Sequence, residues 1–191
     1  KKLLVSLVLS LFVLASKALS FTVDGIYYYT IDDERAAVKV NYTVDPTTYA
    51  FTYHYYTGDL TIPSSVTYNE KTYKVTRVDL YGCSELTSVS LPSTLEEIAE
   101  CGFGDCSQLT QITLPESLKK IGGFAFQSCD NIKEITIPAS VREIGQDAFT
   151  LSGIEKMVIK DLAAWCGVKK AGGFISSLTK VFLNDQEIKD L

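Results

Sequence analysis

The stretch Leu86–Asn131, "LTSVSLPSTLEEIAECGFGDCSQLTQITLPESLKKIGGFAFQSCDN", contains one 23-residue pattern twice in succession. The next stretch, Ile132–Gly153, repeats the pattern with one residue fewer. Self-similarity at a fixed period of about 20 to 50 residues is the sequence signature of stacked repeats. The chain is therefore predicted to form a solenoid. Three landmarks keep their place in every repeat: a Leu-Pro or Ile-Pro pair (Leu91-Pro92, Leu114-Pro115, Ile137-Pro138), an isoleucine (Ile98, Ile121, Ile144) and a phenylalanine (Phe103, Phe126, Phe149).

Each repeat is expected to make one coil of this solenoid. In "TSVSLP", polar and apolar residues alternate, which predicts a strand with one buried face that ends at the proline. "LEEI", "LKKI" and "VREI" place two apolar residues inward with charges between them. The glycine of the "IG" pair in the second and third repeats allows a tight turn, and "FAFQSC" predicts a short helical turn. Because one coil cannot bury its own inward side chains, neighbouring coils are expected to stack at roughly 4.8 Å and share a core. One layer of that core comprises Leu86, Val89, Leu91, Leu95, Ile98, Phe103 and Cys106.

Three of the five cysteines, Cys83, Cys106 and Cys129, recur at one position of the repeat. Free cysteine is among the most buried residue types, so the favoured interpretation is a column of buried thiols beside the phenylalanine column. A disulfide between neighbouring coils stays open as the alternative, because export from the cell would permit one.

The motif "CGFGDC", Cys101–Cys106, has the composition of a metal knuckle or a redox pair. It lacks the histidine or second cysteine pair that would complete a zinc site, so no metal site is predicted. Cys106 belongs to the cysteine column, whereas Cys101 falls at the position of Phe124 and Asp147. The repeat therefore does not require a cysteine at position 101.

The N-terminal stretch 1–20, "KKLLVSLVLSLFVLASKALS", has the three parts of a secretory signal peptide: two lysines, a short apolar run and small residues before a cleavage site at Phe21. A membrane anchor is the alternative, but the run from Leu3 to Ala15 is shorter than the roughly 20 residues that a span needs. We therefore expect a secreted or cell-surface protein with no membrane span after cleavage. Cleavage removes three of the 18 basic residues and none of the 23 acidic ones, and this acidic balance argues against nucleic acid or an anionic membrane as partner.

The repeats are flanked by segments of different character. Residues 21–74 hold ten of the eleven tyrosines, and "GIYYYTID", "AAVKVNY" and "TYAFTYHYY" read as strands. "SSVTYNEKTYKV" predicts a hairpin that turns at Asn69-Glu70-Lys71. We expect a β-rich N-terminal cap over 21–74, repeats over 75–160 and an irregular C-terminal segment or partial repeat over 161–191. In the last segment, "DLAAWCGV" predicts a short helix that starts near Asp161, and "LTKVFLNDQEIKDL" predicts strand, turn and strand.

The motifs "ITLPESLKKIGGFAFQSC" and "ITIPASVREIGQDAF" resemble the BspA-like leucine-rich repeat family, a secreted or surface family with 23-residue repeats. The N-terminal "VDGIYYYTID" and "LTIPSSVTYNEKTYKVTRV" also resemble the start of such proteins. Two positions depart from the pattern: Leu80 stands where later coils have phenylalanine, and Leu151-Ser152-Gly153 replaces the cysteine of the last full coil. The resemblance implies a leucine-rich-repeat solenoid, mainly β with short helical turns. It also implies a protein of host-associated bacteria or mucosal parasites, some of whose relatives bind host extracellular matrix proteins or act in adhesion.

The function expected from these features is non-enzymatic binding of an extracellular or surface protein, of the matrix type, with no cofactor. A stacked ladder presents a broad polar sheet that suits protein recognition. Solvation alone is the plainer explanation of the polar positions on this sheet. The candidate contact positions on the outward side of the predicted strands are Ser88, Gln111 and Glu134, and Ser90, Thr113 and Thr136.

Two alternatives belong to other functional classes. The repeats could serve only as a structural spacer in a larger surface protein. An enzyme is the remote alternative, with a site near His54, because that residue is the single histidine of the chain and any Ser-His-Asp or Cys-His arrangement would have to use it. His54 lies in an alternating strand among tyrosines, so a structural strand residue is the favoured interpretation. The acidic pair Glu96-Glu97 is interpreted as a charged edge, because the equivalent positions carry Lys119-Lys120 and Arg142-Glu143.

Overall fold

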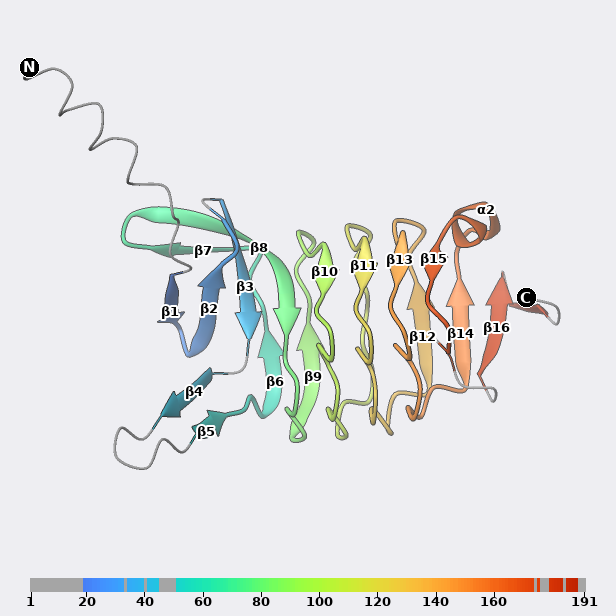
Figure 1. Cartoon of the computed structure of the whole chain (residues 1–191), viewed down its shortest axis with the longest axis horizontal. Coiled ribbons are helices and arrows are strands. Elements are labelled where there is room, and N and C mark those ends of the chain that lie inside the picture. The colour runs from blue at the N-terminus through green and yellow to red at the C-terminus, as the bar shows by residue number, and fades with distance from the viewer. Residues whose placement is uncertain are drawn as a thin grey trace, which may run out of the picture.

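The computed structural model describes residues 19–32, 34–39, 41–44, 51–173, 175, 179–183 and 185–188. Its coils stand side by side along the long axis, with a group of strands at the N-terminal end and a short helix near the C-terminal end (Figure 1). Residues 1–18 of the predicted signal peptide lie outside the described residues. No helix in the described part of the chain is both long enough and apolar enough to cross a membrane.

The first long ladder of the solenoid is a parallel sheet built from one short strand per coil. It runs β8 (Lys71–Asp79), β10 (Glu97–Ile98), β11 (Lys120–Ile121), β13 (Glu143–Ile144) and β15 (Lys169–Lys170). The landmark isoleucines pair directly, because Ile98 lies opposite Ile121 and Ile121 lies opposite Ile144. These three side chains are at most 1% exposed, as the pattern predicts for an inward position.

The N-terminal strands extend this same sheet. An antiparallel pair joins β1 (Ser20–Val23) to β2 (Ile26–Thr30), and a second one joins β2 to β3 (Arg35–Lys39). β3 then pairs in parallel with β8. β7 (Ser65–Tyr68) forms the predicted hairpin with β8, and its two turn residues, Asn69 and Glu70, have φ angles of 48° and 64°. Two left-handed residues define the turn type that matches the twist of paired strands. β4 (Asn41–Val44) and β5 (Phe51–His54) form a separate antiparallel pair.

The second ladder lies on another side of the coils and is interrupted. β6 (Gly58–Thr61) pairs in parallel with β9 (Leu86–Ser90). A separate sheet holds β12 (Glu134–Ile137), β14 (Lys156–Ile159), β16 (Lys180–Leu183) and β17 (Gln186–Ile188), of which the last two form the predicted strand, turn and strand.

The predicted strand of the middle coil is missing from this second ladder. Residues 110–114 keep the exposed and buried alternation of a strand, but they pair with neither β9 nor β12. Within the described part of the chain, their backbone groups make no backbone hydrogen bond. The segment is held instead by burial of Leu109, Ile112 and Leu114 and by the other two sides of its coil.

The third side of each coil is a chain of turns rather than the helical turn that the sequence suggests. Cys101 O accepts a hydrogen bond from Gly104 N at 2.8 Å within one turn. Between coils, Cys101 N donates to Gly123 O and Phe103 N donates to Ala125 O, each at 2.8 Å. This side is therefore a row of turns joined from coil to coil by backbone hydrogen bonds, which we call the turn ladder.

The core consists of columns of equivalent side chains. The rings of Phe103, Phe126 and Phe149 stack with centroids 5.5 and 5.3 Å apart, and Leu80 extends their buried column. The cysteine column is also buried, and Cys83, Cys101, Cys106, Cys129 and Cys166 are all free thiols. Of the first predicted layer, Val89 and Leu91 are only partly buried, whereas its other five members are fully buried.

The glycine that follows the landmark isoleucine serves a different purpose from the one expected. Gly122 does not have a positive φ, so it is not required by a left-handed turn. A Cβ at this position would lie 2.4 Å from Ala99 O of the preceding coil, and one at Gly145 would lie 2.3 Å from Gly123 N. These glycines are needed because the backbones of adjacent coils approach closely here.

The C-terminal segment continues the coils and includes one helix. α2 (Leu162–Cys166) begins after Asp161, whose carboxylate accepts a hydrogen bond from Ala164 N at 2.7 Å. This is an N-cap of the expected kind. β15 and β16, which follow α2, extend the first and second ladders.

Candidate protein-binding surface

Four of the six predicted contact residues line one shallow hollow. Ser88 and Ser90 come from β9, and Gln111 and Thr113 come from the unpaired segment of the middle coil. Residues 59–61 of β6 complete the lining, and the volume of the hollow is about 340 Å³. Here the N-terminal strands and the first two repeats contribute to one continuous polar surface.

Asp59 is a member of this surface that sequence reasoning missed. Its Oδ1 accepts hydrogen bonds from Ser88 Oγ at 2.6 Å and from Thr87 Oγ1 at 3.1 Å. These two hydrogen bonds, that from Ser88 first, lower the pKa of Asp59 below its ordinary value. The available signal was "LTIP" at Leu60–Pro63, whose Ile62-Pro63 repeats the Ile-Pro form of the landmark and so indicates another coil strand just after Asp59.

The remaining two predicted residues, Glu134 and Thr136, lie outside the hollow. The Glu134 carboxylate forms an ion pair with Lys156 Nζ at 3.1 Å, and Thr136 is half-buried opposite Val158. The ladder that joins their strand to the first two coils is absent at residues 110–114. The structure therefore separates the six predicted contact residues into four that line the hollow and two that lie on the paired strand β12.

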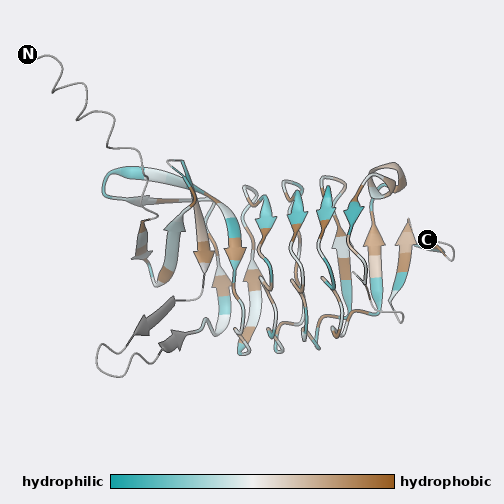
Figure 2. Cartoon of the chain, viewed as in Figure 1, coloured by the Kyte–Doolittle hydropathy of each residue, from teal (hydrophilic) through white to brown (hydrophobic). Residues whose placement is uncertain are grey.

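A second polar surface follows the first ladder. Arg77, Glu97, Lys120, Glu143 and Lys169 lie in register on five neighbouring strands, so that positive and negative charges alternate. Figure 2 shows the hydrophilic residues of β10, β11 and β13 as a row, whereas β14 and β16 are largely apolar.

Neighbouring charges of this row form ion pairs. Glu97 lies 3.2 Å from Arg77 and 3.8 Å from Lys120, and Lys120 lies 3.6 Å from Glu143. Glu96 lies 3.2 Å from Lys119. Opposite charges directly across a ladder stabilise one register over others. The acidic pair Glu96-Glu97 thus has a structural explanation.

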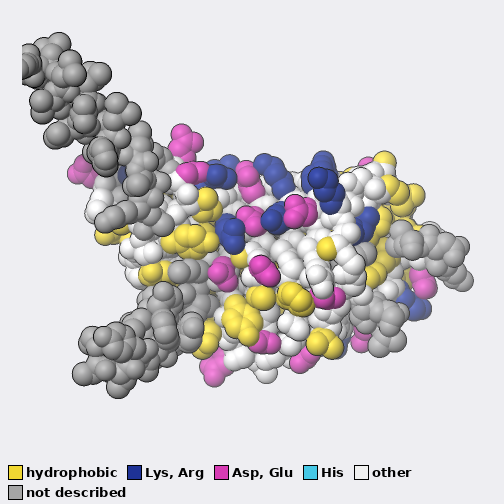
Figure 3. Space-filling model, viewed as in Figure 1, with side chains coloured by type: hydrophobic (Ala, Val, Ile, Leu, Met, Phe, Trp, Pro, Cys, Tyr) yellow, Lys and Arg dark blue, Asp and Glu magenta, His cyan; other side chains and the backbone are white. Residues whose placement is uncertain are grey.

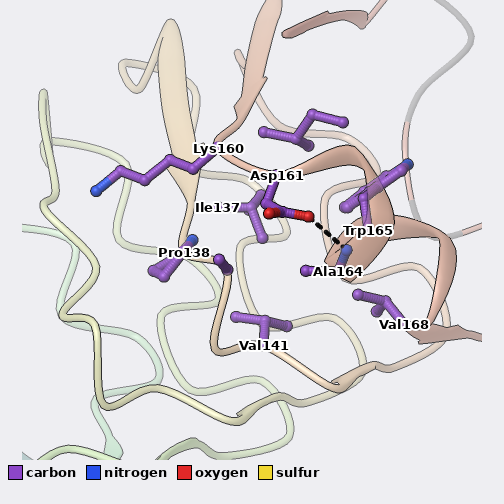
Figure 4. Close-up of a pocket in the computed structure, with 10 residues that line it drawn as sticks. Ile137, Pro138, Val141, Lys160, Asp161, Ala164, Trp165 and Val168 are labelled. Atoms are coloured by element: carbon purple, nitrogen blue, oxygen red, sulfur yellow. Dashed lines mark hydrogen bonds between the residues drawn. The ribbon is translucent and has the colours of Figure 1, made fainter.

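A small hollow lies beside α2, at the C-terminal end of the coils. Figure 4 shows Pro138, Val141, Trp165 and Val168 around it, with Asp161 turned toward Ala164. Its volume is about 10 Å³, which is room for about one water molecule. Small-molecule sites are typically about 300 to 1,000 Å³, so this hollow is too small for a ligand.

The buried thiols are poor candidates for chemistry. Burial raises the pKa of Cys83 to about 11 and that of Cys129 to about 12, and it raises the pKa of Cys106 as well. A thiol needs its thiolate form to act as a nucleophile or a metal ligand. In the parts of the chain that the structure describes, no three His, Cys, Asp or Glu side chains converge to hold a metal ion. The backbone of His54 lies in β5, and its side chain lies outside the described residues.

The stacked coils, their columns of equivalent residues and their parallel ladders define a leucine-rich-repeat solenoid. The sequence profile of the BspA type leucine rich repeat region matches residues 44–164 with six copies. The chain therefore belongs to the BspA-type leucine-rich-repeat family. No curated protein matches it.

Solved structures of bacterial leucine-rich repeat proteins share the fold. A leucine-rich repeat protein from Bacteroides ovatus is 27% identical, with a TM-score of 0.66; the match covers 85% of this chain and 40% of that one. A leucine-rich repeat protein from Bacteroides capillosus is also 27% identical, with a TM-score of 0.59, and the match covers 74% of this chain and 99% of that one. A leucine rich cell surface protein from Faecalibacterium prausnitzii is 18% identical over 89% of this chain and 56% of that one, with a TM-score of 0.52.

Proposed function

We propose that this chain is a non-enzymatic binding module, exported to the cell surface or beyond, that recognises an extracellular protein. The observation that carries the proposal is the strand-face hollow, defined here as the surface around Asp59, Ser88, Ser90, Gln111 and Thr113. The BspA-type family and the cell surface protein among its structural neighbours support the location.

The shape and chemistry of the strand-face hollow suit a protein partner. It is broad and shallow, and its polar side chains are short hydroxyls, one amide and one carboxylate. Short side chains lose little conformational entropy when a partner orders them. The unpaired backbone groups of residues 110–114 offer further hydrogen-bonding sites at its edge.

A pull-down from extracellular-matrix extract tests the proposal. The mature chain should recover a specific protein, and the double variant Gln111→Arg/Thr113→Arg should lose it because two long charged side chains then fill the hollow. The matched control is Ser65→Arg/Ser93→Arg, which adds the same charge at two exposed positions outside the hollow. Recovery of nothing specific, or equal recovery by all three proteins, would count against the proposal.

The alternative is a spacer role within a larger surface protein. It is kept because the match to the Bacteroides ovatus protein covers 40% of that longer chain, so coils of this kind form one part of that relative. A spacer should tolerate the Gln111→Arg/Thr113→Arg change with no loss of any binding or display of its parent protein.

A further inference from the structure

The turn side of the first three coils carries a second exposed surface that the strand-face hollow does not include. We call it the aromatic–acidic surface and define it as Tyr81, Glu100, Cys101, Asp105 and Phe124. Tyr81 is 50% exposed, Glu100 is exposed, and the other three are partly exposed. Figure 3 shows separate apolar side chains with acidic ones around them on the face toward the viewer, below the row of paired charges.

Three residues of this surface have a backbone conformation that is uncommon for residues other than glycine. Cys101, Asp105 and Phe124 have φ angles of 55°, 60° and 54°, which is the left-handed region that glycine and asparagine prefer. Phe124 is only half-buried, so core packing does not offset the strain of an aromatic residue there. Fold stability alone therefore does not explain a phenylalanine at position 124.

Tyr81 is fixed on the surface by two contacts. Its ring lies against Gly104, where an added Cβ would be 3.1 Å from Tyr81 Cδ2. Interaction of its hydroxyl with the Asp105 carboxylate raises the pKa of Tyr81 above its ordinary value. The ring is thus held in place and half-exposed beside a carboxylate.

A hollow of about 380 Å³ adjoins this surface. Phe124 and Glu100 line one side, and Gly122, Gly123 and Gly145 are also in its lining. The charged residues in the same lining, Arg77, Glu97, Lys120 and Glu143, are those that already pair with one another.

The carboxylates of the aromatic–acidic surface are not neutralised by cations. Glu100 and Asp105 form no ion pair with any residue that the structure describes. Burial raises the pKa of Cys101, and then Glu100, Asp79 and Asp105 raise it further, so this thiol is surrounded by negative charge. The acids of the first ladder differ, because Glu96, Glu97 and Glu143 each have a lysine partner.

We propose that the aromatic–acidic surface binds an arginine-containing, positively charged segment of a partner polypeptide. Carboxylates without a cation attract the guanidinium charge, and a guanidinium group also stacks on exposed aromatic rings. The adjoining hollow accommodates the extended backbone of such a segment. This interaction is separate from the strand-face hollow, so the two proposals fail or succeed independently.

The test uses a fluorescein-labelled peptide of alternating glycine and arginine, with a citrulline version of the same peptide as the uncharged probe. Fluorescence anisotropy of the whole chain should show binding of the arginine peptide and none of the citrulline peptide in about 50 mM salt. Phe124→Asn should weaken binding at least about threefold, the size of one exposed cation–π contact. The same variant should melt no lower than the wild type, because asparagine suits the left-handed backbone. A loss of binding therefore cannot be attributed to unfolding.

Matched controls separate this site from general attraction to an acidic protein. Leu151→Asn makes the same kind of change at an exposed left-handed residue, with φ of 52°, on the fourth coil, and should leave binding unchanged. Glu100→Gln/Asp105→Asn should weaken binding at least about tenfold, since both are charge-assisted contacts. Glu85→Gln/Asp130→Asn removes the same charge elsewhere and should have little effect. No binding of the arginine peptide, or equal effects of site and control variants, would overturn the proposal.

Discussion

Single side chains hold the coils together by stacking on their equivalents in the next coil. Phe126 lies in the middle of the phenylalanine column, with Phe103 and Phe149 on its two sides, and all three are fully buried. Aromatic pairs at these separations contribute beyond the area that they bury. The column is therefore the place where one truncation disturbs several coils.

We expect Phe126→Ala to lower the free energy of unfolding by about 3 to 5 kcal/mol, because it removes two ring contacts and leaves a cavity. Phe126→Leu should cost less, since Leu80 already occupies an equivalent place in the column. Urea unfolding followed by circular dichroism measures both changes. Equal stabilities of the alanine variant and the wild type would show that the column is not part of the shared core.

The glycines at positions 122 and 145 allow the backbones of adjacent coils to approach closely. Gly122→Ala would place a Cβ 2.4 Å from Ala99 O, so the two coils must move apart and we expect a loss of more than about 2 kcal/mol. Gly172→Ala is the matched control, because nothing lies within 4 Å of its added Cβ and its φ is not positive. The control should be neutral or slightly stabilising. Similar thermal melting of the two variants would contradict the close approach of the coils.

The buried thiols make stability depend on alkaline pH. The pKa of Cys83 is raised from 9.0 to about 11 and that of Cys129 from 9.0 to about 12. Between pH 9.0 and these folded-state pKa values, the unfolded chain loses thiol protons that the folded chain keeps. The raised thiol pKa values therefore contribute fully to the free energy of unfolding below pH 9, and this contribution falls as pH rises toward the folded pKa values. The free energy of unfolding in urea should therefore be lower at about pH 10 than at about pH 8. Cys83→Ala/Cys129→Ala should lose less over this step, and an equal loss would contradict the assignment.

At the scale of elements, the three sides of a coil are not equally strong. The first ladder and the turn ladder continue from coil to coil, whereas the second ladder stops at residues 110–114. The same segment supplies Gln111 and Thr113 to the strand-face hollow. The candidate binding surface thus coincides with the weakest backbone pairing of the described coils.

Hydrogen exchange reports this difference directly. The amides of Gln111 and Thr113 should exchange much faster than those of Thr136 and Val158, because only the latter lie in a paired ladder. The buried Ile121 amide of the same coil serves as an internal control and should be protected. Equal protection across residues 110–114 and β12 would show that the ladder is continuous in solution.

At the scale of the whole molecule, the period of the sequence predicts the columns well. The registers of Ile98, Phe103 and Cys106 follow from a spacing of 23 residues, and each of these side chains is fully buried. The contact between Asp59 and Ser88 could not be predicted in this way. The hairpin of β7 and β8 lies between β6 and β9, so Pro63 and Pro92 are 29 residues apart and the period is broken.

Two other features depend on geometry that the repeat alone does not specify. The missing ladder at residues 110–114 depends on how far apart the backbones of neighbouring coils lie, and the "TQITLP" pattern is the same as in a paired strand. The left-handed backbone at position 101 is shared by Cys101, Phe124 and Asp147. These three side chains have nothing chemical in common, so a comparison of the repeats does not predict a left-handed backbone at this position. The φ angles of the structure are needed to show it.

The most direct test of the central claim, that a protein partner contacts the strand-face hollow, is a hydrogen-exchange footprint with the partner recovered from matrix extract. Added partner should slow exchange in residues 58–61, 86–90 and 109–115, and should leave the first ladder at β10, β11 and β13 unchanged. Protection confined to the first ladder, or no protection at all, would contradict the account.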